Sequence, residues 1–260
     1  MTIGILSKLD PDSLWNMCST NKKYMRVCKE NRDLILKNVL REHNVDYKDP
    51  RSLVYIRRVR ERGVYKYEYM DINNFKRVDG SYKVGEIFLR YKRLWYNETG
   101  ELNIGGLGIR NIPKMPKLKK LICEDNQLKG LPDFERLQYL DCRTNEIERL
   151  GRMPMLVELY TGRNPLREIG GLERLEHLVG GELLKLERLW GMESLEMVTL
   201  RVSGKIKLED IRSEDGIVMA IQGREGIRSV EEYVPETVNV YVNRLDIRVI
   251  SMGGGEVDVD

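Results

Sequence analysis

The side chains able to do chemistry are few and scattered in this chain of 260 residues. Its two histidines, His43 and His177, stand in unrelated contexts, whereas an enzyme needs reactive groups that converge. The glycine run at 105–108 lies inside a repeat, where glycines shape a turn and do not cradle a phosphate. We therefore expect no catalysis, no cofactor and no metal ion.

The four cysteines are Cys18, Cys28, Cys123 and Cys142, and no two of them form a Cys-x-x-Cys pair. Neither a zinc cluster nor a redox dithiol is therefore indicated. Cys123 and Cys142 occupy the same inward column one repeat apart. In a reducing compartment we expect them to be small core hydrophobes and not a disulfide.

A pattern that recurs every 19 residues organises the chain between Leu118 and Leu189. Each unit reads Leu-x-x-Leu-x-apolar-x-x-Asn-x-apolar-x-x-apolar, with some departures. The four clearest units begin at Leu118, Leu137, Leu156 and Leu175. Their strongest columns are Leu121, Leu140, Leu159 and Leu178, and the asparagines Asn126, Asn145 and Asn164. Independent helices would not keep such columns.

Each unit combines a short segment of alternating apolar residues, which predicts one β-strand, with an asparagine where the chain must turn. A carboxamide both donates and accepts, so stacked asparagines can form a ladder that satisfies buried backbone groups. Burial of the apolar side chains of one unit stabilises it by about 10 to 12 kcal/mol. Ordering the backbone costs about 1 to 2 kcal/mol for every residue of the unit, so one unit cannot fold alone. Stacking supplies the remaining burial.

This pattern resembles the leucine-rich repeat family, in the short form whose convex side is extended, over well more than half the chain. Weaker units extend it to about eight, with strands near Leu102, Val198, Ile217 to Ile221, and Val240. The ladder asparagine is replaced in the outer units by Leu107, Leu183 and Ser203. The resemblance implies a solenoid over residues 99–252 with a parallel β-sheet on its concave face.

Residues 1–45 predict three short helices with little core of their own. Asp10 before Pro11 caps the first, over Asp12 to Cys18, and Ser19 or Thr20 ends it and caps the next. The second groups Tyr24, Val27 and Cys28, and the third begins near Asn31 and presents Leu34, Ile35, Val39 and Leu40. A docking module is the expected result.

This segment resembles the F-box family, and giant-virus F-box-like proteins in particular, in its Leu-Asp-x-Asp, Thr-Asn-Lys and Cys segments. The family's usual Trp in the third helix is missing, with Leu34 or Leu36 nearby. The resemblance implies docking of a Skp-type adaptor through Leu9, Pro11, Leu14, Met17 and Cys18. The alternative is a three-helix cap on the solenoid.

Residues 46–98 predict a basic, Tyr-rich linker and solenoid cap. A helix after Pro50 is expected to present Arg57, Arg58, Arg60 and Arg62, and the alternating tyrosines of 65–69 predict a half-buried strand. Nucleic-acid binding is the alternative. Acidic residues interrupt the positive charge, so a solvated basic face is favoured.

Side chains between the core leucines should point outward from the sheet and mix aromatic residues with both signs of charge, as protein-contact centres do. We expect a protein client to contact Lys120, Ile122, Glu124, Tyr139, Asp141, Arg143, Glu158, Tyr160, Arg163, His177 and Val179.

The chain is therefore expected to be an α+β monomer in which an F-box-like helical module precedes a leucine-rich-repeat solenoid and a flexible acidic tail at 253–260. The first 98 residues hold 21 Lys and Arg against 13 Asp and Glu, and the rest 23 against 28, so the halves should meet different partners. No long apolar segment or signal peptide is visible, which favours the cytoplasm or nucleus. The joint expectation is a substrate adaptor of a cullin-type ubiquitin ligase; the alternative is a stand-alone repeat protein that binds or sequesters a partner.

Overall fold

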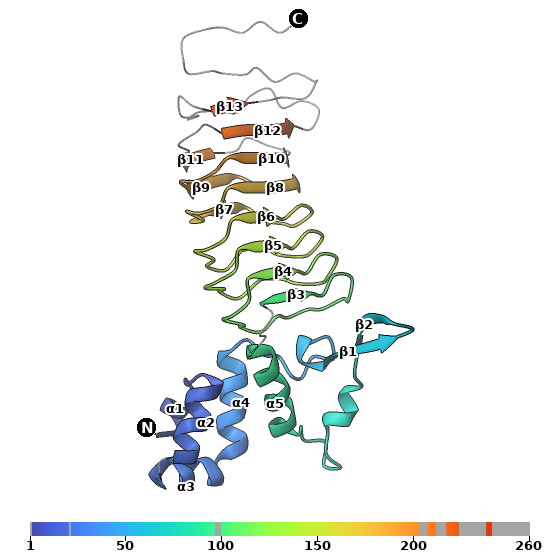
Figure 1. Cartoon of the computed structure of the whole chain (residues 1–260), viewed down its shortest axis with the longest axis vertical. Helices are drawn as coiled ribbons and strands as arrows, with labels where there is room; N and C mark the ends of the chain where they lie inside the picture. Colours follow the sequence, from blue (N-terminus) through green and yellow to red (C-terminus); the bar gives the residue numbers. More distant parts are fainter. Residues whose placement is uncertain are drawn as a thin grey trace, which may run out of the picture. The chain divides into compact units, whose positions relative to one another are not determined.

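The computed structural model describes residues 2–20, 22–96, 100–202, 207–211, 217–223 and 238–240, and beyond residue 202 it describes the strands alone. The chain divides into two compact units (Figure 1). Residues 1–98 and 107–117 form the helical unit, and residues 99–106 and 118–260 form the solenoid unit. Within the described residues, no helix combines the length and apolar character needed to cross a membrane.

The helical unit begins with four helices: α1 (Thr2–Leu6), α2 (Pro11–Thr20), α3 (Lys22–Glu30) and α4 (Arg32–Glu42). Asp10 caps α2 as predicted, because its Oδ1 accepts the backbone N–H groups of Asp12 and Ser13 at 2.9 and 3.0 Å. The expected third helix is α4. It buries Ile35, and Leu34 is exposed where burial was expected.

The end of α2 differs from the prediction. The helix continues through Ser19 and Thr20, whose hydroxyls donate back to the carbonyl oxygens of Trp15 and Asn16 at 2.7 and 2.6 Å. Both residues therefore belong to the last turn of α2, which extends beyond the predicted end at Cys18. This back-bonding satisfies carbonyl groups that the end of a helix leaves without an intrahelical partner.

The helix expected after Pro50 is wrong. A single 3₁₀ turn, η1 (Leu53–Tyr55), leads instead into β1 (Ile56–Glu61), which pairs antiparallel with the expected tyrosine-rich strand β2 (Val64–Tyr69). Arg62 and Gly63 join the strands with φ angles of 47° and 84°. Positive φ at both central residues favours a tight hairpin turn, and this turn decides the conformation of the basic segment.

Residues 46–98 are not a separate linker, because they complete the core of the helical unit. The 3₁₀ turn η2 (Ile72–Phe75) precedes α5 (Val84–Trp95), which the sequence analysis missed. Apolar side chains of α5 recur at helical spacing. The buried cluster joins α4 and α5 to the intervening segment through residues that include Val39, Tyr55, Phe75, Ile87, Phe88 and Tyr91.

The solenoid unit is built on a parallel sheet of eight strands in the order β13-β12-β10-β8-β6-β5-β4-β3. Its best-defined strands follow the 19-residue spacing. The strands are β3 (Glu101–Asn103), β4 (Lys120–Ile122), β5 (Tyr139–Asp141), β6 (Glu158–Tyr160), β8 (His177–Glu182), β10 (Met197–Val202), β12 (Ile217–Gly223) and β13 (Val238–Val240). Leu121, Leu140, Leu159 and Leu178 are register partners and are fully buried, as the columns predicted.

A second, three-stranded parallel sheet consists of β7 (Glu168–Gly170), β9 (Arg188–Met192) and β11 (Lys207–Ile211). Each of these strands comes from the return segment of a turn. No helix interrupts the described residues between 100 and 202, so the return segments are extended as expected. The predicted ladder position at Ser203 and the predicted tail at 253–260 lie outside the described residues.

The asparagine ladder is confirmed within the described turns. Asn145 Nδ2 donates to the carbonyl oxygen of Cys142 in its own turn at 3.1 Å and to that of Cys123 in the previous turn at 2.9 Å. Its Oδ1 accepts the Leu128 N–H at 3.0 Å. Asn164 repeats these contacts one turn later. One side chain thus ties two consecutive turns together, as a stacked architecture requires.

Candidate functional site

The exposed face of the eight-stranded sheet carries two rows of side chains from the central strands. In one row Lys120, Tyr139, Glu158 and His177 are register neighbours, and in the other Ile122, Asp141, Tyr160 and Val179 are. Most of these side chains are half-buried, whereas Asp141 is buried. The structure therefore brings the predicted face residues together on β4, β5, β6 and β8.

An aromatic group forms the centre of this face. The rings of Tyr139 on β5 and Tyr160 on β6 lie 5.4 Å apart and are inclined by 36°. Lys120 Nζ lies 4.7 Å from the Tyr139 ring centroid, and Arg143 Cζ lies 5.8 Å from that of Tyr160. We call Lys120, Tyr139, Asp141, Arg143 and Tyr160 the tyrosine cluster. Cations over aromatic faces attract the ring quadrupole and order the group.

The two tyrosines lie on adjacent strands but are not directly opposite each other: they are diagonal neighbours. Tyr139 pairs with Glu158, and Tyr160 pairs with Asp141. The diagonal distance across a sheet is within reach of aromatic side chains, which explains the contact between the rings. Burial raises the pKa of both phenols, so that both remain neutral donors.

Asp141 was expected to point outward as a contact residue, and the structure places it inside the cluster with 4% of its surface exposed. Arg143 covers it, donating from Nε to Oδ1 at 2.9 Å and from Nη2 to Oδ2 at 2.7 Å. This hydrogen bonding raises the pKa of the Arg143 guanidinium. Asp141 is therefore a positioning residue for Arg143, because a forked pair holds the guanidinium in one orientation.

The remaining charged side chains on this face form separate pairs. Arg143 also reaches Glu124 at 3.0 Å, and Arg163 lies 3.4 Å from Glu182. His177 Nε2 lies 3.6 Å from a carboxylate oxygen of Glu196, and this contact is an ion pair only when the imidazole is protonated. These pairs are solvent-exposed, and such pairs contribute about 0 to 1 kcal/mol each. Their effect is to order the charges around the tyrosines.

The inward cysteines behave as expected. Cys123 and Cys142 are free and buried, and burial raises the pKa of the Cys142 thiol to about 12 and shifts that of Cys123 in the same direction. Both therefore remain protonated and unreactive. In the glycine run, Gly106 has a φ of 68° and donates its N–H to the Glu124 carbonyl oxygen at 2.9 Å, so the run shapes a turn.

The predicted adaptor-facing residues are only partly at the surface. Pro11 and Leu14 lie in the core of the helical unit, whereas Leu9, Met17 and Cys18 are half-buried. Packing of α2 onto α4 and α5 accounts for this burial, since Leu14 belongs to their common cluster. Contact with a partner is thus left to Leu9 and Met17, with Pro11 and Leu14 supporting them.

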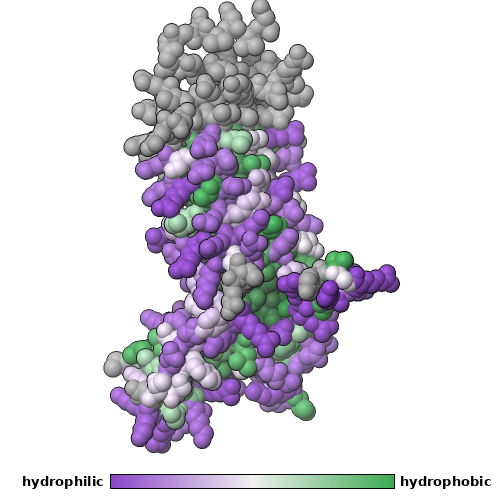
Figure 2. Space-filling view, in the orientation of Figure 1, coloured by the Kyte–Doolittle hydropathy of each residue, from purple (hydrophilic) through white to green (hydrophobic). Residues whose placement is uncertain are grey.

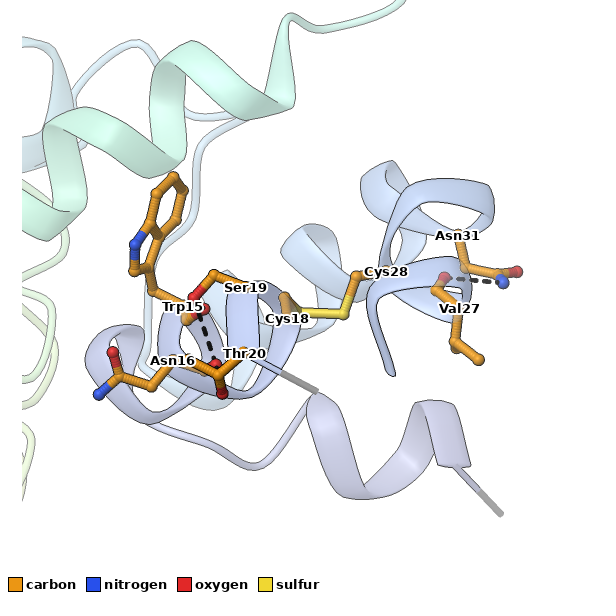
Figure 3. The surroundings of a disulfide bond; sticks show 8 residues. All are labelled: Trp15, Asn16, Cys18, Ser19, Thr20, Val27, Cys28 and Asn31. Carbon is orange, nitrogen blue, oxygen red and sulfur yellow. Dashed lines mark hydrogen bonds between the residues drawn. A yellow bond between two sulfur atoms is a disulfide. The ribbon is translucent and has the colours of Figure 1, made fainter. Parts of the chain in front are cut away.

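A disulfide between Cys18 and Cys28 is a feature that the sequence analysis missed. It joins α2 to α3 beside Trp15 (Figure 3). The two cysteines lie ten residues apart, a spacing that indicates no particular bond by itself. The feature of the sequence that could have indicated the bond is that each cysteine lies near the end of one of two consecutive short helices.

The basic segment at 57–62 lies on the exposed β1–β2 hairpin. Arg57 Nε donates to Glu68 Oε1 at 2.7 Å, and Lys66 pairs with Glu61 at the same distance. Cross-strand acids thus offset part of the positive charge, as the interrupting acidic residues suggested. Over the described ranges, no group of three or more His, Cys, Asp or Glu side chains could hold a metal ion.

Comparison of the chain with protein-family models, with curated proteins and with solved structures found no match.

Proposed function

We propose that the chain is a protein-binding adaptor whose solenoid unit is a leucine-rich repeat domain that holds a client protein. Supporting the leucine-rich repeat identity are the 19-residue period, the parallel register of the central strands and the asparagine ladder. Eight strands at roughly 4.8 Å spacing give a face about 35 to 40 Å long, enough for a standard protein interface.

The tyrosine cluster is the single observation that carries this proposal. Its rings are half-exposed yet ordered by each other and by Lys120 and Arg143. An ordered aromatic pair loses little conformational entropy on binding, which favours it as an interface centre. Surrounding charges of both signs, at Glu124, Glu158 and Arg163, would select the client through electrostatic complementarity.

The helical unit is proposed to dock a Skp-type adaptor of a cullin ubiquitin ligase in the cytoplasm or nucleus, where the Cys18–Cys28 disulfide would be reduced, so that docking does not depend on this bond. Support comes from the F-box resemblance; the three helices expected over residues 1–45 are present as α2, α3 and α4, preceded by the additional helix α1. Leu9 and Met17 are the residues of the predicted set that retain side-chain surface outside the disulfide. We therefore assign them the adaptor contact.

A stand-alone repeat protein that binds a partner without a ligase is the second candidate. It is favoured by the burial of Pro11 and Leu14, since these residues then stabilise the helical unit and need no docking role. Under this interpretation the client-binding face is unchanged.

Affinity purification followed by mass spectrometry separates the two candidates. Wild type should capture a Skp-type adaptor together with a client, and Leu9→Ala with Met17→Ala should lose the adaptor alone. Leu34→Ala is the matched control, because Leu34 is an exposed leucine of the same unit. A wild-type protein that captures a client and never an adaptor would establish the stand-alone candidate.

A further inference from the structure

The helical unit contains an apolar groove that the proposed function does not use. It lies among α2, α3, α4 and α5, and its volume is about 340 Å³. Pro11, Leu14, Ile35, Leu36 and Phe88 form its floor, and the Cys18–Cys28 disulfide forms part of one wall. Ligand sites span roughly 300 to 1,000 Å³ and are mostly apolar, so the groove has the size and character of a binding site.

Large apolar side chains remain exposed at the mouth of this groove. Trp15, Met25 and Leu89 line it, and their relative exposures are 61%, 47% and 53%. Hydrophobic side chains interrupt the otherwise hydrophilic surface of the helical unit (Figure 2). Single exposed apolar residues are ordinary, whereas several around one concavity indicate a surface that binds apolar matter.

The charged residues that line the groove are all cationic: Lys29, Arg32 and Lys92. Lys92 Nζ lies 5.2 Å from the Trp15 ring centroid and 3.8 Å from Asp12, and the Trp15 side chain extends from α2 toward α5 (Figure 3). Arg32 extends over Gly85, since a Cβ there would meet Arg32 Nη2 at 3.2 Å. The groove therefore has an apolar interior and positively charged side chains around its mouth.

We propose that this groove binds a free single-chain anionic amphiphile, with its alkyl chain on the Leu14, Ile35 and Phe88 floor. The anionic head group lies against Arg32 and Lys29, with Lys92 closing the opposite side of the mouth. Apolar burial supplies the affinity, and the three cations select a negative head over a neutral or positive one.

A small ligand fits the groove better than a partner protein does. A groove of about 340 Å³ is within the size range of small-molecule sites, whereas a specific protein interface buries about 800 Å² of surface on each partner. Leu9 and Met17, to which the adaptor contact is assigned, do not line the groove, and neither does the tyrosine cluster; Pro11, Leu14 and Cys18 of the predicted adaptor-facing set do line it. The groove would still be expected to bind its ligand if the chain had no role in a ubiquitin ligase.

Isothermal titration of the oxidised full-length chain with octanoate, decanoate and dodecanoate, each below its micelle concentration, tests the chain length. The dissociation constant should fall about fourfold per added methylene. Decanol and decyltrimethylammonium should bind at least tenfold more weakly than decanoate. Equal affinity for the three head groups, or binding to anionic phosphatidylglycerol vesicles without binding to decanoate, would overturn the proposal.

Variants then locate the site. Gly85→Leu should fill the groove and weaken decanoate binding at least tenfold, while its helix propensity preserves α5. Arg32→Gln should weaken binding severalfold, and Lys37→Gln, an exposed cation of α4 outside the groove, should leave it unchanged. Full decanoate affinity in a folded Gly85→Leu protein contradicts the assignment.

Methyl NMR of the wild-type chain keeps the proposal testable if the variants fail to fold. Decanoate should shift the methyl signals of Leu14, Ile35 and Leu36 and leave that of Leu159, deep in the solenoid, unchanged. Shifts confined to the solenoid, or spread evenly over both units, would show that decanoate binds elsewhere.

Discussion

At the residue scale, the ladder asparagines hold the central turns in register because each one satisfies backbone groups of two turns. Asn145 makes three donor contacts and accepts one N–H, all with main-chain atoms. The asparagine column in the sequence predicted this role, since a carboxamide supplies two N–H donors and a carbonyl acceptor in one short side chain. Leu183 fills the ladder position one turn after Asn164 and is fully buried.

Asn145→Ala should therefore lower the free energy of unfolding of the solenoid unit by about 1 to 3 kcal/mol. The cost arises because the Leu128 N–H and the Cys123 carbonyl lose a buried partner. Urea unfolding measures it, with Glu146→Ala, at an exposed neighbour, as the control. Identical urea midpoints for the two variants would refute the ladder.

The residue before each ladder asparagine carries backbone strain. Asp125, Thr144 and Arg163 have φ angles of 53°, 55° and 57°, and Thr144 is β-branched. Left-handed backbone costs an L-residue about 1 to 2 kcal/mol, and a β-branched side chain is an outlier there. Gly106 occupies the same position in the first turn, without that cost.

Thr144→Gly should stabilise the solenoid unit by about 0.5 to 1 kcal/mol, since relief of strain exceeds the added entropy of the unfolded chain. Thr199→Gly is the matched control. Thr199 is an exposed threonine on β10, where glycine should lower the urea midpoint. A fall in midpoint for both variants would contradict the strain at Thr144.

At the element scale, the short helices of the helical unit depend on contacts between elements. α2 and α3 are joined covalently through Cys18 and Cys28, and α4 and α5 pack on a common core. Helices of 9 to 12 residues are marginal in isolation, so this packing decides their stability. His43, at the end of α4, lies in the same core with its ring centroid 4.8 Å from that of Trp95.

Reduction of the disulfide should lower the stability of the helical unit by about 2 to 3 kcal/mol, because the unfolded chain regains the entropy of the short loop it closed. Hydrogen exchange of the α2 and α3 amides, with and without dithiothreitol, measures the change. In the double variant Cys18→Ala with Cys28→Ala, the exchange rates should be the same with and without dithiothreitol. A wild-type protein indifferent to dithiothreitol would rule out this contribution.

The helical unit should also lose stability as pH falls through the titration of His43. Burial, aided by Lys114, lowers the pKa of His43 below its usual 6.5, so the unfolded chain binds the proton more readily. Stability is therefore full above pH 6.5 and declines below it. The carboxyl of Asp10, whose pKa is lowered, adds its own loss only as pH falls below about 3.8.

Exchange rates of the α4 and α5 amides at pH 7.5 and 5.5, corrected for intrinsic exchange, report this loss. His43→Phe keeps the aromatic contacts with Tyr91 and Trp95 and removes the titration, so its stability should be equal at the two pH values. A wild-type stability that rises on acidification to pH 5.5 would be the wrong sign for a buried neutral histidine.

At the scale of the whole molecule, the two units carry surfaces of different composition and charge. The first 98 residues carry an excess of positive charge, whereas the tyrosine cluster on the solenoid is surrounded by both signs. The proposed adaptor contact and the proposed client contact are therefore assigned to different units. Each contact can then be removed without the other.

Tyr139→Ala with Tyr160→Ala should abolish client capture while preserving adaptor capture and the melting transition, because both rings are half-exposed and lie outside the buried leucine columns. Tyr67→Ala, a half-buried tyrosine of the β1–β2 hairpin, is the matched control for pull-down and calorimetry. Client retention by the double variant would move the search to the basic hairpin at 57–62, where salt-sensitive retention on nucleic acid is the next measurement.

The sequence alone determined the features that repeat along the chain or lie within a few residues of each other. The leucine columns, the asparagine ladder, the Asp10 cap and the aromatic face all follow from local spacing, which stacking then multiplies. The helix spacing of Val84, Ile87, Phe88 and Tyr91 was readable in the same way and was missed.

Only the tertiary structure decided the features that depend on which segments meet. The basic segment became β1 because β2 pairs with it, and Asp141 became buried because Arg143 folds over it. Cys18 and Cys28 form a disulfide because α2 and α3 pack together, and the same packing with α4 and α5 encloses the apolar groove. Such contacts depend on distances between elements, which local periodicity does not encode.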